Sequence, residues 1–472
     1  MYKLYRKGLS IFLVLLMVMG VISGVIVPSG GTSHAAVSFA GGTGSESDPF
    51  QIATADQLNA VRDHLEARLY FELIADIDLS SYANWEPIGS YDYDNFFYGN
   101  MDGNGFKITN LKIVNELSGG IGLFGANKGR ISNVILENIL VEGKYDVGGL
   151  VGINEGTISN SYATGNVHGY QLVGGLAGYN LGGTISKSYA TGSVTGNRNL
   201  GGLVGGNRGT ISNSYAAVSV SGDVGVDVDI DIVGGLVGFN GLTGIINNSY
   251  ATGSVNGTND VGGLVGWNSS AINHSFYDSN TTGRLDTGKG TGKTTSEMQD
   301  PNTFSDWNFS EDWYMLTGHY PELWAFVALT PGTNVGTTKL SGVSSEMEYK
   351  VNTGSYTTIM NTSVDNIVVE VGDMIYLRVK GASQPASDEQ ILSVGIEDIT
   401  ILPITTAAIA GVTAPVTGAT PVTAVTYSAE YTATVNWSPT TTLFAPEKAY
   451  TATIAITPKA GYTLTGVPAN FF

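Results

Sequence analysis

Hydrophobic and polar positions between residues 121 and 276 follow a short phrase that recurs six times. The copies are IGLFGANKGRISNVI from Ile121, GGLVGINEGTISNSY from Gly148, GGLAGYNLGGTISKSY from Gly174, GGLVGGNRGTISNSY from Gly201, GGLVGFNGLTGIINNSY from Gly234 and GGLVGWNSSAINHSF from Gly262. Short apolar runs separated by Gly and Asn indicate strands rather than helices. The unequal spacing of the copies is typical of a solenoid, in which an insertion bulges from one coil. We therefore predict an all-β chain built on a parallel β-helix (β-solenoid), with one phrase and two or three short strands per coil.

Stacked coils would place equivalent residues of the phrase in columns. One predicted column is a ladder of amide side chains that hydrogen-bond between coils, with the asparagines also suited to a left-handed corner: Asn127, Asn154, Asn180, Asn207, Asn240 and Asn268. A second column is apolar: Ile131, Ile158, Ile185, Ile211, Ile246 and Ile272. A third is mostly aromatic: Ile135, Tyr162, Tyr189, Tyr215, Tyr250 and Phe276.

The flanks of the repeat predict caps and further β modules. Thr54 and Gln57 have capping-box spacing ahead of a helical apolar face formed by Leu58, Val61 and Leu65. Short alternating runs with Gly and Pro turns after residue 328 are typical of small β-sandwiches. The predicted organisation is a signal peptide at 1–36, an N-terminal cap with the first coils at 37–118, the repeat solenoid at 119–277, its C-terminal cap at 278–327, and two β-sandwich-like modules at 328–401 and 402–472, of which the second is expected to be incomplete.

The N-terminus and the composition favour an exported, acidic protein. Lys3, Arg6 and Lys7 precede an apolar run, and small residues up to Ala36 offer a cleavage site, although the run is also long enough for an uncleaved anchor. Removing this segment takes the net charge from −19 to −22. Nucleic-acid binding is therefore not expected, nor is a membrane location after cleavage. The absence of Cys excludes disulfides and thiol chemistry.

The repeated phrase resembles the GLUG motif of bacterial surface and secreted proteins, over about residues 120–280. The resemblance implies a β-helical protein associated with cell surfaces or adhesion, and it supplies no catalytic residues. The last two modules resemble those of cell-wall or S-layer-associated proteins of Gram-positive bacteria. S-layer homology domains, with which such proteins often end, are not present in the sequence.

Candidate binding residues lie where the phrase varies. The residue before the ladder asparagine is aromatic in three copies, and Tyr179, Phe239 and Trp267 are predicted to form a stacking surface for sugar rings; packing against a neighbouring loop is the alternative. The longest unit contains Asp227, Asp229 and Asp231 at strand spacing, which could hold Ca²⁺ or form a solvated strand face. Ca²⁺ is the only cofactor that the sequence suggests. Asp76, Asp78 and Asp102 are interpreted as turn residues rather than as a carboxylate pair for glycoside cleavage.

These patterns predict a secreted or wall-associated protein that binds without catalysis. The expected partner is a polysaccharide, a cell-wall polymer or a host surface polymer. The alternatives are a β-helix polysaccharide-degrading enzyme, either a lyase or a glycoside hydrolase, and a stalk without a ligand of its own.

Overall fold

The computed structural model describes residues 37–91, 95–223, 232–316, 318–380, 389–407, 409–425 and 428–468. The predicted signal peptide at 1–36 lies outside these residues. Strands dominate the described chain, and its helices are short: α1 (Ala55–Ala60), α2 (Ser279–Thr282), α3 (Thr295–Met298) and the 3-10 segments η1 (Val61–Asp63), η3 (Pro301–Phe304) and η4 (Trp324–Phe326).

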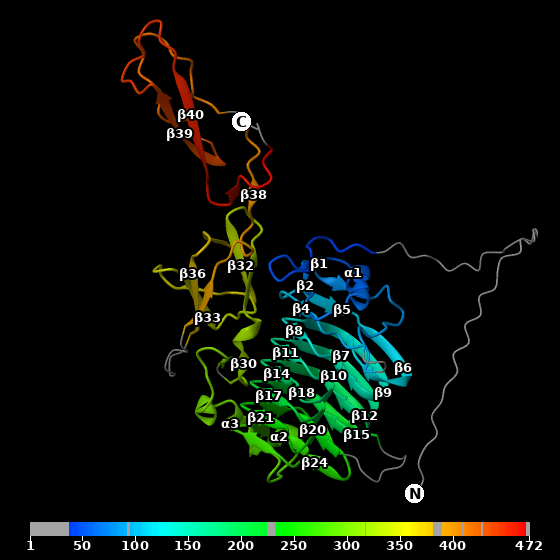
Figure 1. Ribbon diagram of the computed structural model, residues 1–472. Helices are drawn as coiled ribbons and strands as arrows, with labels where there is room; N and C mark the ends of the chain where they lie inside the picture. The colour runs from blue at the N-terminus through cyan, green and yellow to red at the C-terminus, as the bar shows by residue number, and fades with distance from the viewer. Residues whose placement is uncertain are drawn as a thin grey trace, which may run out of the picture. The chain divides into compact units, whose positions relative to one another are not determined.

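The chain winds into a β-solenoid whose faces are three parallel sheets (Figure 1). Sheet A contains β1 (Phe50–Ile52), β2 (Tyr70–Leu73), β4 (Asn100–Asp102), β8 (Arg130–Ser132), β11 (Thr157–Ser159), β14 (Thr184–Ser186), β17 (Thr210–Ser212), β21 (Ile245–Asn247) and β26 (Ala271–Asn273). Sheet B contains β7 (Phe124–Asn127), β10 (Val151–Asn154), β13 (Ala177–Asn180), β16 (Val204–Asn207), β20 (Val237–Asn240) and β25 (Val265–Asn268). Sheet C contains β3 (Ile77–Asp78), β5 (Lys107–Thr109), β6 (Lys112–Ile121), β9 (Ile135–Gly148), β12 (Tyr162–Gly174), β15 (Tyr189–Gly201), β18 (Tyr215–Gly222), β19 (Ile232–Gly234), β22 (Tyr250–Thr252), β23 (Val255–Asn256), β24 (Asp260–Gly262), β27 (Phe276–Asp278) and β28 (Thr291–Lys293).

Each repeat supplies one strand to sheet B, then one to sheet A, and then its strand or strands to sheet C. Neighbouring coils pair in parallel with the predicted registers: Asn154 pairs with Asn180, Ile158 with Ile185, and Tyr162 with Tyr189. The β-solenoid and its three columns are confirmed, with three sheet faces per coil.

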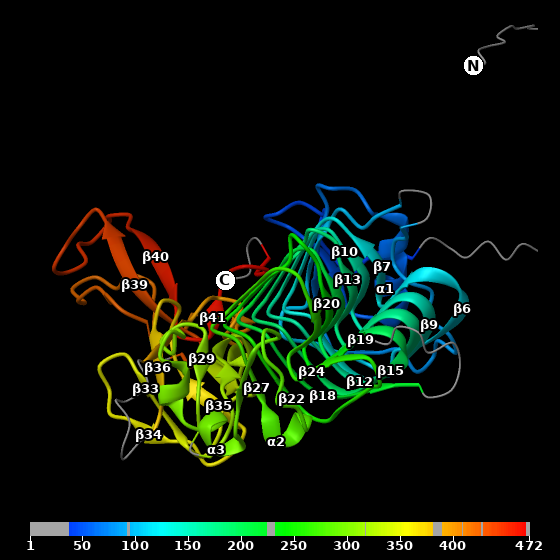
Figure 2. The same cartoon turned by 90° about the horizontal axis from the view of Figure 1, so that it is seen from below.

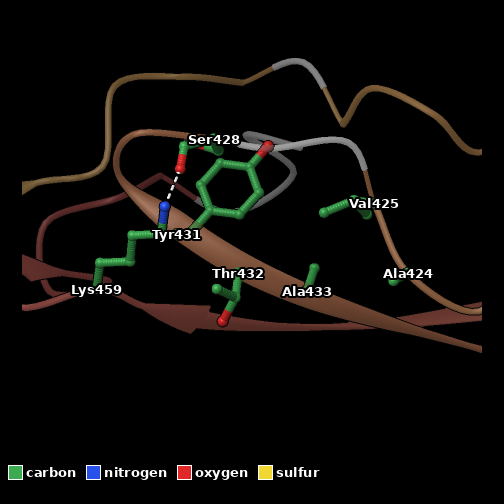
Figure 3. Close-up of a pocket in the computed structure, with 7 residues that line it drawn as sticks. All are labelled: Ala424, Val425, Ser428, Tyr431, Thr432, Ala433 and Lys459. Carbon is green, nitrogen blue, oxygen red and sulfur yellow. Dashed lines mark hydrogen bonds between the residues drawn. The ribbon is translucent and has the colours of Figure 1, made fainter.

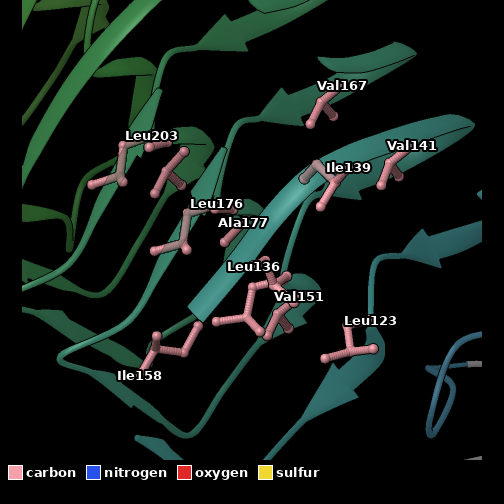
Figure 4. Close-up of a cluster of buried hydrophobic side chains, with 14 of the residues drawn as sticks. Leu123, Leu136, Ile139, Val141, Val151, Ile158, Val167, Leu176, Ala177 and Leu203 are labelled. Atoms are coloured by element: carbon pink, nitrogen blue, oxygen red, sulfur yellow. The ribbon is translucent and has the colours of Figure 1, made fainter. Parts of the chain in front are cut away.

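The interior is a continuous apolar core (Figure 4). Leu150, Leu176 and Leu203 occupy one turn position in successive coils, and all three are fully buried together with the isoleucine column on sheet A, apart from the partly buried Ile272 at its end. Each such side chain contributes roughly 1.5–3 kcal/mol by leaving water. Because every coil buries the same positions, conserving the phrase conserves the core.

The asparagine ladder runs unbroken through the six coils. Each Nδ2 donates to the Oδ1 of the next asparagine at 2.8–2.9 Å, from Asn127 to Asn268. A second ladder, which we did not predict, uses the serine before the aromatic column. The backbone N–H of Ser161 donates to Oγ of Ser188 at 3.2 Å, and the pattern repeats in the other coils.

The left-handed backbone lies in another column than predicted. The ladder asparagines do not have positive φ. Positive φ occurs instead at the corner between sheets A and C, two residues after the column isoleucine: Asn133, Asn160, Lys187, Asn213, Asn248 and His274. Asn is among the side chains that tolerate this conformation at lowest cost, so the second asparagine of the phrase, rather than the first, serves the turn.

One glycine column permits close contact between backbones. A Cβ added at Gly178 would lie 2.3 Å from the carbonyl carbon of Asp146, and one at Gly205 would lie 2.4 Å from that of Leu172. The end of each long sheet C strand therefore packs directly on sheet B of a later coil. A side chain at this column would separate the two sheets.

The helix predicted in the N-terminal segment is present as α1, directly after β1, and is short. Thr54 Oγ1 accepts from the N–H of Gln57 at 3.3 Å, while Gln57 Oε1 accepts from the N–H of Ala53 at 2.8 Å. Leu58 and Val61 are buried in the same core as the first strands of sheet A. The helix therefore packs on the first coils, as the apolar spacing indicates.

The segment after the last repeat lies along the tyrosine column. Tyr162, Tyr189, Tyr215 and Tyr250 stack with centroid distances of 4.5–4.9 Å, and Trp307 and Trp313 pack on them with Phe304 and Leu323. Asp312 forms an ion pair with Lys187 at 2.6 Å and accepts from Nδ2 of Asn213 at 3.0 Å. Burial raises the pKa of the Tyr215 and Tyr250 hydroxyls well above the usual range. The ring faces of the tyrosine column are therefore covered by neighbouring tyrosines and by this segment.

The remaining strands form small, mostly antiparallel sheets. Their bounds are β29 (Trp313–Tyr314), β30 (Glu322–Leu323), β31 (Ala328–Pro331), β32 (Thr337–Ser341), β33 (Met347–Val351), β34 (Thr357–Thr358), β35 (Ser363–Val368), β36 (Met374–Val379), β37 (Gln390–Ser393), β38 (Leu402–Pro403), β39 (Tyr431–Ser438), β40 (Thr451–Pro458) and β41 (Tyr462–Thr463). The sheets β31-β32-β35 and β34-β33-β36-β37 share one core around Leu340, Met347 and Ile375, which is a small β-sandwich. After it, β39 pairs with β40 and β38 pairs with β41.

Candidate functional site

The variable residue before the ladder asparagine forms a column of its own on sheet B. Its members pair in register: Ala126, Ile153, Tyr179, Gly206, Phe239 and Trp267. Ala126 and Ile153 form a small apolar cluster with Phe96, and Tyr179 packs against it. This cluster is separate from the central core. The phrase therefore varies where the side chains lie outside the shared interior.

Phe239 and Trp267 stack face to face at the end of sheet B. Their ring centroids are 4.9 Å apart, and the planes differ by 8°. Trp267 is on β25, the last strand of the sheet, and is 37% exposed. Phe239 covers one face of the indole, and the outer edge of β25 is bounded by the backbone of Lys289, whose oxygen accepts from the N–H of Val265 at 3.1 Å. A partly exposed indole of this kind can stack on an apolar ring surface.

Tyr179 is separated from this pair by one coil. The intervening position is Gly206, and a Cβ added there would lie 2.5 Å from Cδ2 of Leu172 and 3.2 Å from the ring of Tyr179. Leu172 and Tyr179 therefore occupy the space beside Gly206. The structure brings Phe239 and Trp267 together and places Tyr179 two coils from Phe239, so sugar binding by the three rings stays a prediction.

Arg208 lies near Phe239 and interacts electrostatically with Tyr179. It was not predicted as a site residue from the sequence. A Cβ added at Gly241 would lie 3.0 Å from both Cγ of Arg208 and Cε1 of Phe239, so the arginine stem and the ring border the same space. Burial raises the pKa of the Tyr179 hydroxyl, and the positive charge of Arg208 opposes that rise. Arg208 forms no ion pair within the described part of the chain. The signal was available, because the residue after the ladder asparagine varies as much as the residue before it.

The acidic residues considered for catalysis have structural hydrogen bonds. Asp76 Oδ1 accepts from the N–H of Lys107, and Asp102 Oδ1 accepts from the N–H of Asn104 and from Nδ2 of Asn133, all at 2.8 Å. Hydrogen bonds from Asn110 and Ser80 lower the pKa of Asp78. All three carboxylates accept hydrogen bonds from nearby backbone or amide groups, and their interpretation as turn residues rather than catalytic residues stays a prediction.

The predicted calcium ligands Asp227, Asp229 and Asp231 lie outside the described residues, so that prediction stays open. The flanking residues Gly222 and Ile232 pair with Gly196 and Asp260 of neighbouring coils. Elsewhere in the described ranges, no group of three or more His, Asp or Glu side chains is placed to hold a metal ion.

A small pocket of about 180 Å³ lies in the C-terminal part of the chain (Figure 3). It is lined by Val425, Tyr431 and Ala433, among others, and the ammonium group of Lys459 donates to the backbone oxygen of Ser428 at its rim. This lining brings no pair of acid–base side chains together. We therefore place the candidate site on sheet B.

Comparison with known proteins identifies the repeat. Residues 143–167 and 169–195 match the family model described as "The GLUG motif". The chain carries GLUG motifs on a parallel β-solenoid. A "Putative Gly-rich membrane protein" of Evansella cellulosilytica is 34% identical over 408 residues, which cover 62% of this chain and 46% of that protein. "Halomucin" of Haloquadratum walsbyi is 38% identical over 149 residues, which cover 29% of this chain and 2% of that protein.

The chain thus spans less than half the length of each of these curated relatives. Among solved structures, a "putative immunoglobulin A1 protease" from Bacteroides ovatus aligns with a TM-score of 0.46 at 22% identity, covering 61% of this chain and 95% of that one. The matches to GLUG proteins and to these relatives fit a surface protein. Within the described residues, no helix has the length and apolar character needed to cross a membrane. S-layer-like modules at 328–472 stay a prediction.

Proposed function

We propose that this chain belongs to a cell-surface protein that binds polysaccharide without cleaving it, with Trp267 as the stacking group. The observation that carries the proposal is the Phe239–Trp267 stack, which ends at a partly exposed indole on the last strand of sheet B. Aromatic rings bind the apolar faces of sugars through area burial and oriented contact.

Arg208 and the fixed backbone add to this proposal. The stem of Arg208 borders the same space as the Phe239 ring, and its guanidinium supplies planar hydrogen-bond donors for hydroxyl or carboxylate groups of a sugar. The ring positions are fixed by ladder pairing, since Phe239 pairs with Trp267 in register and the adjacent asparagines are hydrogen-bonded. A ligand would therefore meet a preorganised surface and lose little affinity to ordering of side chains.

The non-catalytic part of the proposal is supported by the carboxylates. Glycoside hydrolysis commonly uses two carboxyl groups about 5–10 Å apart across one groove, whereas Asp76, Asp78 and Asp102 are engaged in turns and ladders. The site around Trp267 is built from rings, an arginine and backbone. This is the chemistry of retention rather than of bond cleavage.

Affinity electrophoresis and pull-down against a panel of neutral and acidic polysaccharides test the proposal. Trp267→Ala is expected to weaken retention about 5- to 30-fold, which corresponds to about 1–2 kcal/mol. Leu443→Ala removes a 53% exposed apolar side chain outside the solenoid and is expected to leave retention unchanged. The site is wrong if the panel is not retained or if both variants behave like the wild type. Release of reducing ends or unsaturated products would instead support the enzyme alternative.

A further inference from the structure

The long strands of sheet C bend sharply in three successive coils. A Cβ added at Gly169 would lie 3.0 Å from Cγ2 of Val173, and one at Gly196 would lie 3.1 Å from Cδ2 of Leu200. Four residues of extended strand would span about 13 Å. The backbone therefore turns back within these residues, as it does between Gly143 and Val147, whose corresponding distance is 2.9 Å. Figure 2 shows β9, β12 and β15 side by side along this edge.

Each bend presents two residues at its tip, and the tips align between coils. Tyr145 pairs with Gln171, which pairs with Arg198 in the next coil. The glycine before each tip and the apolar residue two positions after it are repeated. The tip residues differ in every coil, and so does the residue that follows them: Asp146, Leu172 or Asn199. We call the aligned tips the tip ridge: Lys144, Tyr145, Tyr170, Gln171, Asn197 and Arg198.

The tip ridge carries two tyrosine rings that are much more exposed than the most buried ring of the tyrosine column. Tyr145 and Tyr170 are 38% and 37% exposed, and their rings meet edge to face with centroids 6.0 Å apart. By contrast, Tyr250 of the stacked column is 2% exposed beneath Trp307 and Trp313. Two exposed rings at right angles offer both a face and an edge to a ligand.

The tip ridge is also cationic in an acidic protein. Lys144 Nζ lies 5.3 Å from the centroid of the Tyr145 ring, and Arg198 follows two coils along the same ridge. Neither side chain forms an ion pair with a residue that the structure describes. The full chain has 41 acidic residues and 22 basic ones, so two cations beside exposed tyrosines form a local exception that would attract anions.

We propose that the tip ridge binds an anionic, carboxylate-bearing polysaccharide. Lys144 and Arg198 meet the carboxylates, the two tyrosines contact the sugar faces, and Gln171 and Asn197 hydrogen-bond to hydroxyl groups. Three acidic groups lie in or beside the site. Asp146 directly follows Tyr145 in the first bend and is half-buried. Glu142 lies before the first tip, in register with His168, and Asp223 begins the acidic insertion in the coil after Arg198, where its N–H donates to the oxygen of Gly196 at 2.7 Å. The bound chain is thereby confined to the three tips.

This proposal is independent of the Trp267 site, which lies on another sheet. Binding of polygalacturonate, with neutral dextran for comparison, is measured by titration calorimetry at low and at moderate salt. We expect polygalacturonate to bind and to weaken with salt. Lys144→Gln/Arg198→Gln is expected to weaken it about fivefold, and Tyr145→Ala/Tyr170→Ala about tenfold, with unchanged circular dichroism in both variants.

The matched control is Lys380→Gln/Lys448→Gln, which removes the same charge elsewhere, including a lysine 5.9 Å from the Tyr450 ring. It is expected to bind like the wild type. The proposal is overturned if polygalacturonate does not bind, if the control loses as much affinity as the cation variant, or if dextran binds equally well. Trp267→Ala separates the two sites, because it is expected to leave polygalacturonate binding intact. If it abolishes binding while the tip variants do not, the tip ridge is wrong and the Trp267 site stands.

Discussion

Replacing Asn180 by Ala tests whether the asparagine ladder stabilises the solenoid. Asn180 is fully buried in the middle of the ladder. Its Nδ2 donates to Asn207 Oδ1 at 2.8 Å and to the Gly183 oxygen at 3.1 Å, and its Oδ1 accepts from Asn154 Nδ2 at 2.8 Å. The substitution removes three hydrogen bonds where water has no access. At about 0.5–1.5 kcal/mol for each bond, we expect the free energy of unfolding to fall by about 2–4 kcal/mol.

The neighbours of Asn180 limit this loss. Asn207 Oδ1 keeps the N–H of Gly209 at 3.2 Å, and Asn154 Nδ2 keeps the oxygen of Gly156 at 3.3 Å, so neither is left without a partner. The matched control is Asn268→Ala at the end of the ladder. Asn268 is only half-buried, and water can replace its bonds, so we expect a loss of about 1 kcal/mol.

Urea unfolding followed by tryptophan fluorescence gives both free energies. Because coils of a solenoid can open separately, hydrogen exchange in β13 and β14 shows whether the loss is local. The reasoning is refuted if the two substitutions cost the same, or if Asn180→Ala costs less than the control. Either result would mean that backbone pairing alone fixes the coil corner.

Two further predictions concern the contact between the sheet C strands and sheet B. Gly178→Ala places a Cβ 2.3 Å from the Asp146 backbone and should abolish folding of the neighbouring coils. The control Gly182→Ala meets open space at φ +85° and should cost only about 1–2 kcal/mol of local strain. Soluble yield and unfolding midpoints of the two variants are compared. Burial raises the pKa of Asp146 to about 6, above an unfolded value of about 3.9, so its contribution to stability is lost as pH rises from about 4 through 6. Asp146→Asn should therefore exceed the wild type by on the order of 2–3 kcal/mol at pH 7.5 and match it at pH 3 in urea unfolding; an equal difference at both pH values would contradict burial as the cause.

The fold could be predicted from the sequence because each coil repeats the same physical problem. A side chain that stacks on its own copy, such as Ile158 or Tyr189, must recur at the same place in the phrase. The serine ladder has the same cause, and Ser161 and Ser188 recur almost as regularly as the asparagines. The serine is replaced by Val134 in the first copy, so it occurs in five of the six. It was missed because a serine in a turn phrase reads equally well as a surface residue. The role of Gly178 depends on which backbone lies opposite, and no local pattern gives that.

The candidate sites could be predicted only in part, because exposure depends on what covers a column. Tyr215 and Trp267 are both aromatic, and both are in register with rings of adjacent coils. Tyr215 is covered by Trp313 from a segment about a hundred residues away, whereas Trp267 ends its stack. The repeated phrase predicts that each ring stacks on its copies in neighbouring coils. It does not predict which rings the segment after the repeat covers.

Stacked columns and bend tips differ in how they can bind a polymer. In a column such as Phe239–Trp267, the rings stack on one another between coils. Only the last ring can offer a face to a ligand, and extra coils add no further site. In the tip ridge, each coil adds two tip residues at a fixed interval of about 4.8 Å. Contacts to a repeating polymer would then accumulate with the number of coils, since each contact raises the effective concentration for the next. A solenoid that binds through its tips gains affinity by repetition, whereas one that binds through its final ring does not. Affinity for polygalacturonate should therefore depend on how many tips carry cations and tyrosines, and affinity at Trp267 should not.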